Sequence, residues 1–363
     1  MGFNCGIVGL PNVGKSTLFN ALTQTASAEA QNYPFCTIDP NLGKVRVADP
    51  RLDKLAQIAG SAKIIPTQME IVDIAGLVKG ASQGEGLGNQ FLGHIRNTDA
   101  ILHIVRCFDN DDVIHITGGV DPIRDIEVVE MELMLADLES LKNRDAQIAK
   151  KNNLELSGEK TLLRKLIEWL EGGEPVSQLN LTSEERRFMN SFHLITEKPV
   201  LYVCNVKESE IVSGNAYSRA VEEFANRRNC QAIIASAVIE SEIAIMNDEV
   251  DRSEYIQSIG LAESGLARIV RRGYDLLNLI TFFTVGPTEA RAWTIVRGTR
   301  APGAAAVIHT DFERGFICAE TINYEDFVFH NGEGGAKLAG KMRLEGKEYV
   351  VNDGDILHFR FNV

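Results

Sequence analysis

The chain has 363 residues, of which 44% are hydrophobic and 24% charged, and its formal net charge at pH 7 is −13. This length suggests two or three domains, and the negative charge argues against indiscriminate nucleic-acid binding over the whole surface, so no DNA partner is predicted. No apolar run is long enough to span a bilayer and the six cysteines form no C-x-x-C pair, so we expect a soluble, cytoplasmic protein with no membrane partner, zinc site or disulfide framework.

The first motif in the chain is a glycine-rich loop from Gly9 to Thr17, with the pattern G-x-x-x-x-G-K-[ST]. The apolar residues 5–8 before it predict a buried strand, and residues 17–22 predict the first turns of a helix. In this order, the backbone N–H groups of the loop and the N-terminus of the helix surround phosphate oxygens. The loop therefore predicts a site for a nucleoside triphosphate.

Individual residues of this loop have expected roles. Lys15 is expected to reach the β- and γ-phosphates and to act in catalysis, and the Ser16 hydroxyl is expected to ligate Mg²⁺. The remaining nucleotide-binding positions predicted here are Asn12, Val13, Gly14 and Thr17.

Alternating strands and helices continue along the first part of the chain and return in its middle. Further apolar strands are predicted at residues 69–73, 100–105, 199–204 and 232–235. Such alternation is typical of a parallel sheet whose carboxyl edge carries the ligand contacts. We therefore predict an α/β P-loop domain made of residues 1–127 and 197–277, with one nucleotide site built from the loops after five strands.

Two loops early in this domain carry the other expected metal ligands. Residues 73–76 form a D-x-x-G pattern directly after a predicted strand. In this position Asp73 suits the hydration shell of Mg²⁺, and the Gly76 N–H suits the γ-phosphate. Thr37 lies upstream, where its hydroxyl would reach Mg²⁺ when the γ-phosphate is present. Ser16, Thr37 and Asp73 are thus the predicted metal ligands.

The glycine-rich stretch of residues 73–88 resembles switch II of the Obg family of P-loop GTPases. Together with the glycine-rich loop, residues 205–208 and the C-terminal region, the resemblance extends over essentially the whole chain and indicates the YchF, or Obg-like ATPase, subfamily. It implies a preference for ATP. Because Leu77 follows the D-x-x-G pattern and cannot hydrogen-bond to water, the resemblance also implies that His115 on a nearby loop orients the attacking water. Asn12 resembles an asparagine with which some relatives ligate K⁺, so a K⁺ site is an open alternative there.

Residues 205–208 read Asn-Val-Lys-Glu, where GTPases of this class use Asn-Lys-x-Asp to recognise guanine. Val206 stands at the lysine position, and Glu208 is one methylene longer than the aspartate. Losing a paired buried acceptor costs about 1 to 3 kcal/mol, so guanine selectivity should fall by tens to hundreds of fold. Asn205 can still bind purine N7, and Ser236 and Ala237 follow the next strand as further nucleotide contacts. Base recognition elsewhere in the chain is the alternative.

Between residues 125 and 198 the alternation of strands and helices stops. Methionine and leucine residues at helical spacing predict two antiparallel helices with an apolar seam, a coiled-coil insertion over residues 128–196. The seam residues are Met131, Met134, Leu138, Leu141, Leu163, Leu166 and Leu170. The hairpin is either structural or an arm that contacts a large partner.

From residue 278 to residue 363 the pattern changes to short β segments around one small-residue helix. Strands are predicted at residues 280–285, 290–295, 315–320 and 356–361, and a helix at residues 301–309. This order describes a β-grasp domain and resembles the TGS domain, which is linked to contact with RNA or the ribosome. Composition adds no support for RNA, because these residues hold nine Lys and Arg against eleven Asp and Glu.

The prediction is a slow Mg²⁺-dependent ATPase that switches between conformations and binds the ribosome or a ribosomal subunit, with tRNA or rRNA as further candidate partners. One alternative is a conventional GTPase on the same fold. The other is a nucleotide-gated adaptor in which hydrolysis is incidental.

Overall fold

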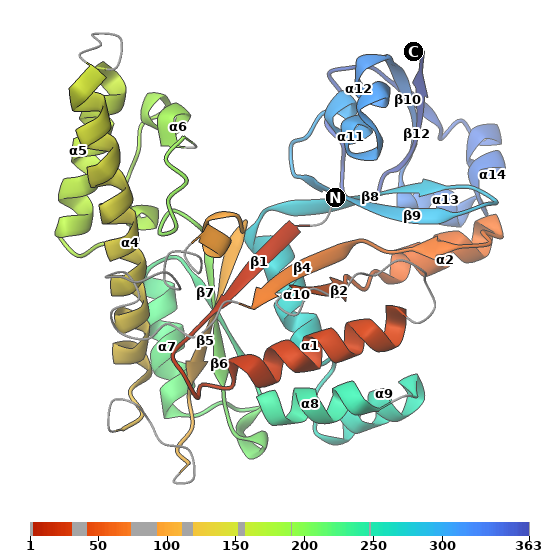
Figure 1. The fold of residues 1–363 in the computed structure, drawn as a ribbon. Helices are drawn as coiled ribbons and strands as arrows, with labels where there is room; N and C mark the ends of the chain where they lie inside the picture. The colour runs from red at the N-terminus through yellow and green to blue at the C-terminus, as the bar shows by residue number, and fades with distance from the viewer. Residues whose placement is uncertain are drawn as a thin grey trace. The chain divides into compact units, whose positions relative to one another are not determined.

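The computed structural model describes residues 3–30, 42–73, 93–110, 119–151, 157–189, 191–246 and 248–362 (Figure 1). The chain divides into two compact units. The P-loop unit consists of Asn4–Gly43 and Ile71–Ile269, and the β-grasp unit consists of Lys44–Glu70, Val270–Val363 and the first three residues. Residues 44–70 thus fold with the C-terminal part of the chain, whereas the sequence placed them in the P-loop domain.

The P-loop unit is built on a six-stranded sheet with the order β2-β4-β1-β5-β6-β7. Its strands are β1 (Phe3–Val8), β2 (Leu42–Arg46), β4 (Gln68–Asp73), β5 (Ala100–Arg106), β6 (Val200–Asn205) and β7 (Gln231–Ala235). β1 pairs in parallel with β5, β5 with β6, and β6 with β7. The loops after these four strands therefore leave the sheet at one edge, as the alternation predicted.

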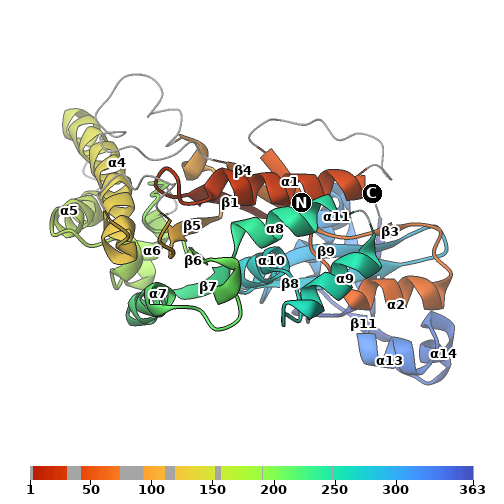
Figure 2. The same ribbon diagram turned by 90° about the horizontal axis from the view of Figure 1, so that it is seen from below.

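The helices of this unit are shown in Figures 1 and 2. They are α1 (Lys15–Ala30), α4 (Pro122–Lys151), α5 (Ser157–Glu171), α6 (Ser183–Met189), α7 (Ala216–Arg227), α8 (Ala237–Ile245) and α9 (Glu249–Ser258), with the short 3-10 helices η3 (Val176–Gln178) and η4 (Glu208–Glu210). α10 (Gly265–Leu276) continues from this unit into the β-grasp unit. Among the described residues, no helix is both long and apolar enough to cross a membrane.

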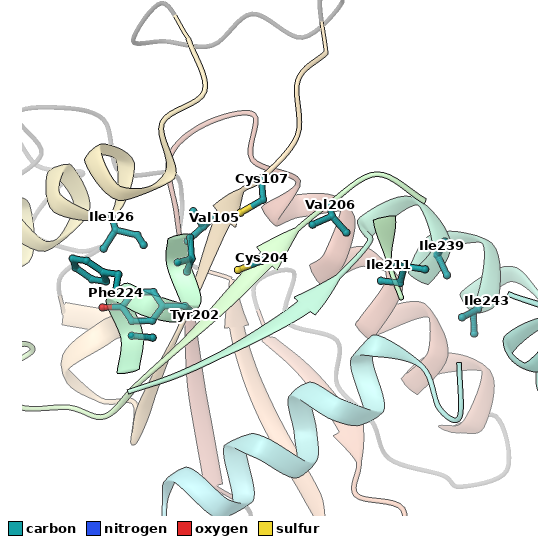
Figure 3. Packing of buried hydrophobic residues seen from close by; sticks show 12 residues of the cluster. Val105, Cys107, Ile126, Tyr202, Cys204, Val206, Ile211, Phe224, Ile239 and Ile243 are labelled. Carbon is teal, nitrogen blue, oxygen red and sulfur yellow. The ribbon is translucent and has the colours of Figure 1, made fainter. Parts of the chain in front are cut away.

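One apolar cluster joins β5 and β6 to the helices beside them (Figure 3). Tyr202 of β6 meets Phe224 of α7 edge to face, with ring centroids 5.9 Å apart. Cys204 and Val206 belong to the same cluster as Ile239 of α8. This cluster fixes the carboxyl end of β6, where the loop expected to read the base begins.

The predicted helical hairpin is formed by α4 and α5, which lie side by side (Figure 1). Met134, Leu141, Leu163, Leu166 and Leu170 are at most 5% exposed in one cluster, which confirms the apolar seam. Met131 was also expected there, but it is 49% exposed. α5 ends at Glu171 and covers the later turns of α4, so the first turns of α4 lack this neighbour.

The β-grasp unit has its own six-stranded sheet, with the order β11-β10-β12-β8-β9-β3. The strands are β3 (Ile64–Ile65), β8 (Leu279–Val285), β9 (Ala290–Val296), β10 (Phe316–Ile322), β11 (Arg343–Glu345) and β12 (Ile356–Phe361). β8 and β9 form an antiparallel pair, β12 is parallel to β8, and β10 is antiparallel to both β12 and β11. This is the predicted β-grasp order with two additional strands: β11 pairs with β10, and β3 joins the free side of β9 in parallel.

Helices cover both faces of this sheet. Successive side chains of a strand point to opposite faces, so neighbouring residues of β8 enter different cores. α11 (Ala301–Ile308) shares a core with Phe282 and Trp293, and α2 (Pro50–Ala59) shares a core with Phe283 on the other face. The remaining helices are α12 (Thr310–Arg314), α13 (Tyr324–Phe329) and α14 (Glu333–Leu338). α2 was not among the predicted helices, although Asp49 at its N-cap, Pro50 at its first turn and Gly60 at its C-cap are signals for its two ends.

β5 of the P-loop unit carries a buried histidine. His103 is 3% exposed, and its ring centroid lies 5.6 Å from that of Tyr202. Burial lowers the pKa of His103 from 6.5 to about 3. The unfolded chain therefore binds a proton here below about pH 6.5, while the folded chain binds it only near pH 3. Since the unfolded state binds more protons in this window, the free energy of unfolding decreases as the pH falls.

Replacing His103 by phenylalanine should remove this contribution. Between pH 7 and pH 5, we expect the parent protein to lose about 2 kcal/mol more unfolding free energy than His103→Phe does. Urea unfolding of both proteins at the two pH values measures the difference. Equal losses in the two proteins would show that the buried histidine does not cause this pH dependence.

Candidate functional site

The glycine-rich loop connects the end of β1 at Val8 to the start of α1 at Lys15, in the predicted order. Two positions require glycine. A Cβ atom at Gly9 would lie 2.7 Å from the carbonyl oxygen of Ile104. Gly14 has a φ of +93°, and a Cβ atom there would lie 2.2 Å from Nδ2 of Asn205. The loop therefore keeps its path close to β5 and β6 only without side chains at these positions.

Lys15 and Asp73 form an ion pair at the carboxyl edge of the sheet. The Lys15 Nζ donates a hydrogen bond to Oδ1 of Asp73. Their side chains are 8% and 19% exposed, so each charge is largely removed from water. The structure thus joins the first turn of α1 to the end of β4, the two elements expected to contact the phosphates and the metal.

Asn205 ties together three loops of the predicted site. It ends β6 and is 3% exposed. Its Nδ2 donates to the carbonyl oxygen of Val13 at 2.8 Å, and its Oδ1 accepts from the backbone N–H of Ala237 at 2.9 Å. A primary amide has two N–H donors, so the second one can still serve purine N7. Asn205 is therefore a structural clamp as well as the predicted base contact.

The other residues of the expected base site lie in different environments. The side chain of Val206 is 2% exposed and belongs to the apolar cluster around β6 (Figure 3). Glu208 is exposed at the first position of η4. Ser236 is fully buried at the N-cap of α8, and its Oγ has no hydrogen-bond partner among the described residues. Residues 205–208 thus combine the buried residues Asn205 and Val206 with the exposed carboxylate of Glu208.

Several predicted site residues cannot be placed. Thr37, Gly76 and His115 lie outside the described residues. Of the predicted metal ligands, Ser16 lies exposed next to Lys15 in α1, and Asp73 ends β4. A hydroxyl and a carboxylate oxygen are ligands that suit Mg²⁺.

Two further residues, which were not predicted as site residues, hold the edge of the sheet. Arg106, at the end of β5, is 2% exposed and donates to the carbonyl oxygens of Phe108 and Asn110 at 3.1 and 3.2 Å. Asn215 donates to the carbonyl oxygen of Cys107 at 2.7 Å. A charged residue that ends an otherwise apolar strand was the signal for Arg106, and the Gly-Asn pair before α7 was the signal for Asn215.

Comparison with known proteins gives consistent results for both units. A family model described as "50S ribosome-binding GTPase" matches residues 4–155. A second model, named for the C-terminal region of the YchF GTPase and described as "Protein of unknown function (DUF933)", matches residues 279–362.

Similar proteins cover the whole chain. The chain is 54% identical to the protein named "Ribosome-binding ATPase YchF" of Haemophilus influenzae and 51% identical to that of Bacillus subtilis, with full coverage of both chains in each case. The solved structure of the Schizosaccharomyces pombe YchF GTPase is 38% identical and has a TM-score of 0.88, with coverage of 99% of this chain and 98% of that one. A GTP-binding protein from Pyrococcus horikoshii, 21% identical with a TM-score of 0.64, covers 99% of this chain and 100% of its own and shares the fold.

Proposed function

This chain belongs to the YchF family of P-loop nucleoside triphosphatases, and from that premise we propose that it is a Mg²⁺-dependent ATPase that switches between conformations and binds the ribosome. The observation that carries the choice of ATP is the loop after β6. It keeps Asn205 as the clamp on the phosphate loop, but it lacks the lysine and aspartate with which guanine is read. We also propose that the protein acts in the cytoplasm, because it is proposed to bind ribosomes.

The phosphate end of the site is supported by the Lys15–Asp73 pair and by the main chain of the loop. Phosphate oxygens that enter the loop would share the Lys15 ammonium with Asp73 and accept hydrogen bonds from N–H groups at the start of α1. When bound, Mg²⁺ would neutralise charge on the β- and γ-phosphates. Ser16, Asp73 and Thr37 are the residues we propose to hold it.

For the base, we propose recognition of adenine by the loop after β6. Asn205 has one N–H donor left for N7, which both purines carry. The buried side chain of Val206 leaves the main chain of this loop as the polar partner for the adenine amine. Glu208, with its longer side chain, replaces the aspartate that pairs with guanine. Ser236 and Ala237 complete this end of the site.

Hydrolysis requires a group that orients the attacking water. We propose His115 for this role, because Leu77 stands where Ras carries the glutamine that orients the water, and we propose the Gly76 N–H as a contact to the γ-phosphate. Asn12, with a φ of +63° in the phosphate loop, is the residue we propose for K⁺ if the protein uses this ion. For the ribosome, the resemblance of the C-terminal region to TGS domains supports an RNA contact, either rRNA or tRNA, by the β-grasp unit.

Nucleotide preference is the first test of this function. In isothermal titration we expect ATP to bind at least tenfold more tightly than GTP, because the groups that pair with guanine have been replaced. Glu208→Asp should narrow this ratio, whereas Glu222→Asp, an exposed change on α7, should leave it unchanged. GTP binding at least tenfold more tightly than ATP would instead establish a conventional GTPase.

Co-sedimentation with ribosomes, with and without ATP analogues, tests the proposed ribosome partner.

A further inference from the structure

The segment Lys44–Glu70 lies, in the chain, between two residues expected to respond to the nucleotide. Thr37 precedes it and Asp73 follows it. Nevertheless, this segment belongs to the β-grasp unit and not to the unit that contains the phosphate loop. We call Lys44–Glu70 the linking segment, because its two ends lie in β2 and β4 of the P-loop sheet while its middle part, from α2 to Thr67, contacts the C-terminal residues.

The centre of the linking segment is part of the core of the β-grasp unit. Leu52, Leu55 and Ala56 of α2 are at most 3% exposed. They share one cluster with Phe283 of β8 and Ile356 of β12. Burying large apolar side chains of this kind stabilises the folded state strongly. α2 therefore cannot separate from the sheet without disrupting its core.

A charged contact holds the start of α2. Arg51 donates through Nη1 to Oδ2 of Asp353 at 2.7 Å and also binds Asp49 at 2.8 Å. The Asp353 carboxylate in turn accepts from the backbone N–H of Thr281 at 2.9 Å. This contact joins α2 to β8 and to the turn before β12.

The second half of the linking segment is attached to β9. The N–H of Ala62 donates to the carbonyl oxygen of Pro287, and the N–H of Ala290 donates to that of Lys63, at 3.0 and 2.9 Å. The hydroxyls of Thr67 and Thr294 lie 2.6 Å apart and are buried. The Tyr274 hydroxyl also bonds to Thr294. Position 67 is therefore fixed to β9 by its side chain.

From this fixed point the chain runs straight to the predicted metal ligand. β4 extends from Gln68 to Asp73, the residue that pairs with Lys15. Six strand residues span about 20 Å. An extended strand is stiff along its length, so a displacement of Asp73 is transmitted to Thr67 more directly than it would be through a loop.

We propose that the linking segment couples the nucleotide site to the β-grasp unit, through β4 and the Thr67–Thr294 contact. This inference rests on the proposed nucleotide binding. It adds the path by which a change at the nucleotide site reaches the β-grasp unit. Exchange of the diphosphate for the triphosphate changes the partners of Asp73, and the change reaches the β3–β9 pair. Because coupling between binding sites is reciprocal, a partner on the β-grasp unit that prefers one arrangement changes the affinity for nucleotide by the same factor.

Hydrogen exchange of the full-length protein tests this coupling. The protein is saturated with Mg²⁺ and either ADP or a non-hydrolysable ATP analogue, and binding of each is verified by titration calorimetry. We expect the exchange rates at Ala62 and Ala290 to differ at least threefold between the two nucleotides. The amides of β10, on the far side of β12, serve as the internal control and should not respond.

Two matched variants test the route. Thr294→Val removes the hydroxyl that binds Thr67 and should at least halve the difference at Ala290. Thr321→Val makes the same change at a buried threonine of the same sheet, whose hydroxyl donates to the carbonyl oxygen of Ala319 in its own strand, and should preserve the difference. An unchanged difference in Thr294→Val overturns the proposed route.

The remaining outcomes separate this inference from the proposed function. If both nucleotides bind but the exchange rates at Ala62 and Ala290 are equal, the coupling is overturned and the ATPase proposal stands. If neither nucleotide binds, both are overturned.

Discussion

Lys15→Met is expected to weaken ATP binding at least about 100-fold, or by about 2.7 kcal/mol, and to abolish measurable turnover. The Lys15 ammonium is the buried cation of the phosphate loop, and charge-assisted hydrogen bonds to phosphate are strong where water is excluded. The variant also leaves the Asp73 carboxylate, 19% exposed, without its cation, which adds repulsion toward the triphosphate. Titration calorimetry and phosphate release measure the two effects.

Lys337→Met is the control for this prediction, because it removes one positive charge from an exposed position on α14. It should bind ATP as the parent protein does. If Lys15→Met binds ATP with parental affinity, the triphosphate does not lie in the glycine-rich loop and the site described here is wrong.

Gly14→Ala is expected to abolish ATP binding by a different mechanism. The φ of +93° disfavours any side chain, and the new Cβ would overlap Nδ2 of Asn205 at 2.2 Å. Asn205 cannot move aside without losing its hydrogen bonds to Val13 and Ala237. The substitution therefore disrupts the phosphate loop and the loop after β6 together. We expect at least a 100-fold loss of affinity and a lower free energy of unfolding.

Gly298→Ala separates the effect of backbone strain at a positive φ from the effect of the overlap with Asn205. Gly298 has a φ of +92°, almost the same as Gly14, but a Cβ atom there would meet nothing within 4 Å. This variant should lose about 1 to 2 kcal/mol of stability from backbone strain and bind ATP normally. Equal nucleotide affinities in the two variants would show that the overlap with Asn205 does not control the site.

Much of the P-loop unit was predictable because its signals are local. A buried strand, a glycine loop with lysine and a helix stand next to one another in the chain, so residues 5–22 predict both the structure and its ligand. The alternation of strands and helices predicts which loops share an edge of the sheet. The burial of Val206 was not predictable in this way, because it depends on contacts with α8, more than 30 residues later in the chain.

The sequence by itself determined the phosphate loop, the alternation of strands and helices and the β-grasp pattern, because each depends on residues that are close in the chain. Only the tertiary structure decided that Asn205 clamps three loops and that residues 44–70 fold into the β-grasp unit. The apolar side chains of α2 would fit the core of either unit by composition. Which core they enter depends on complementary shape and on contacts such as Arg51 with Asp353, separated by 302 residues, and no local pattern in the chain encodes these.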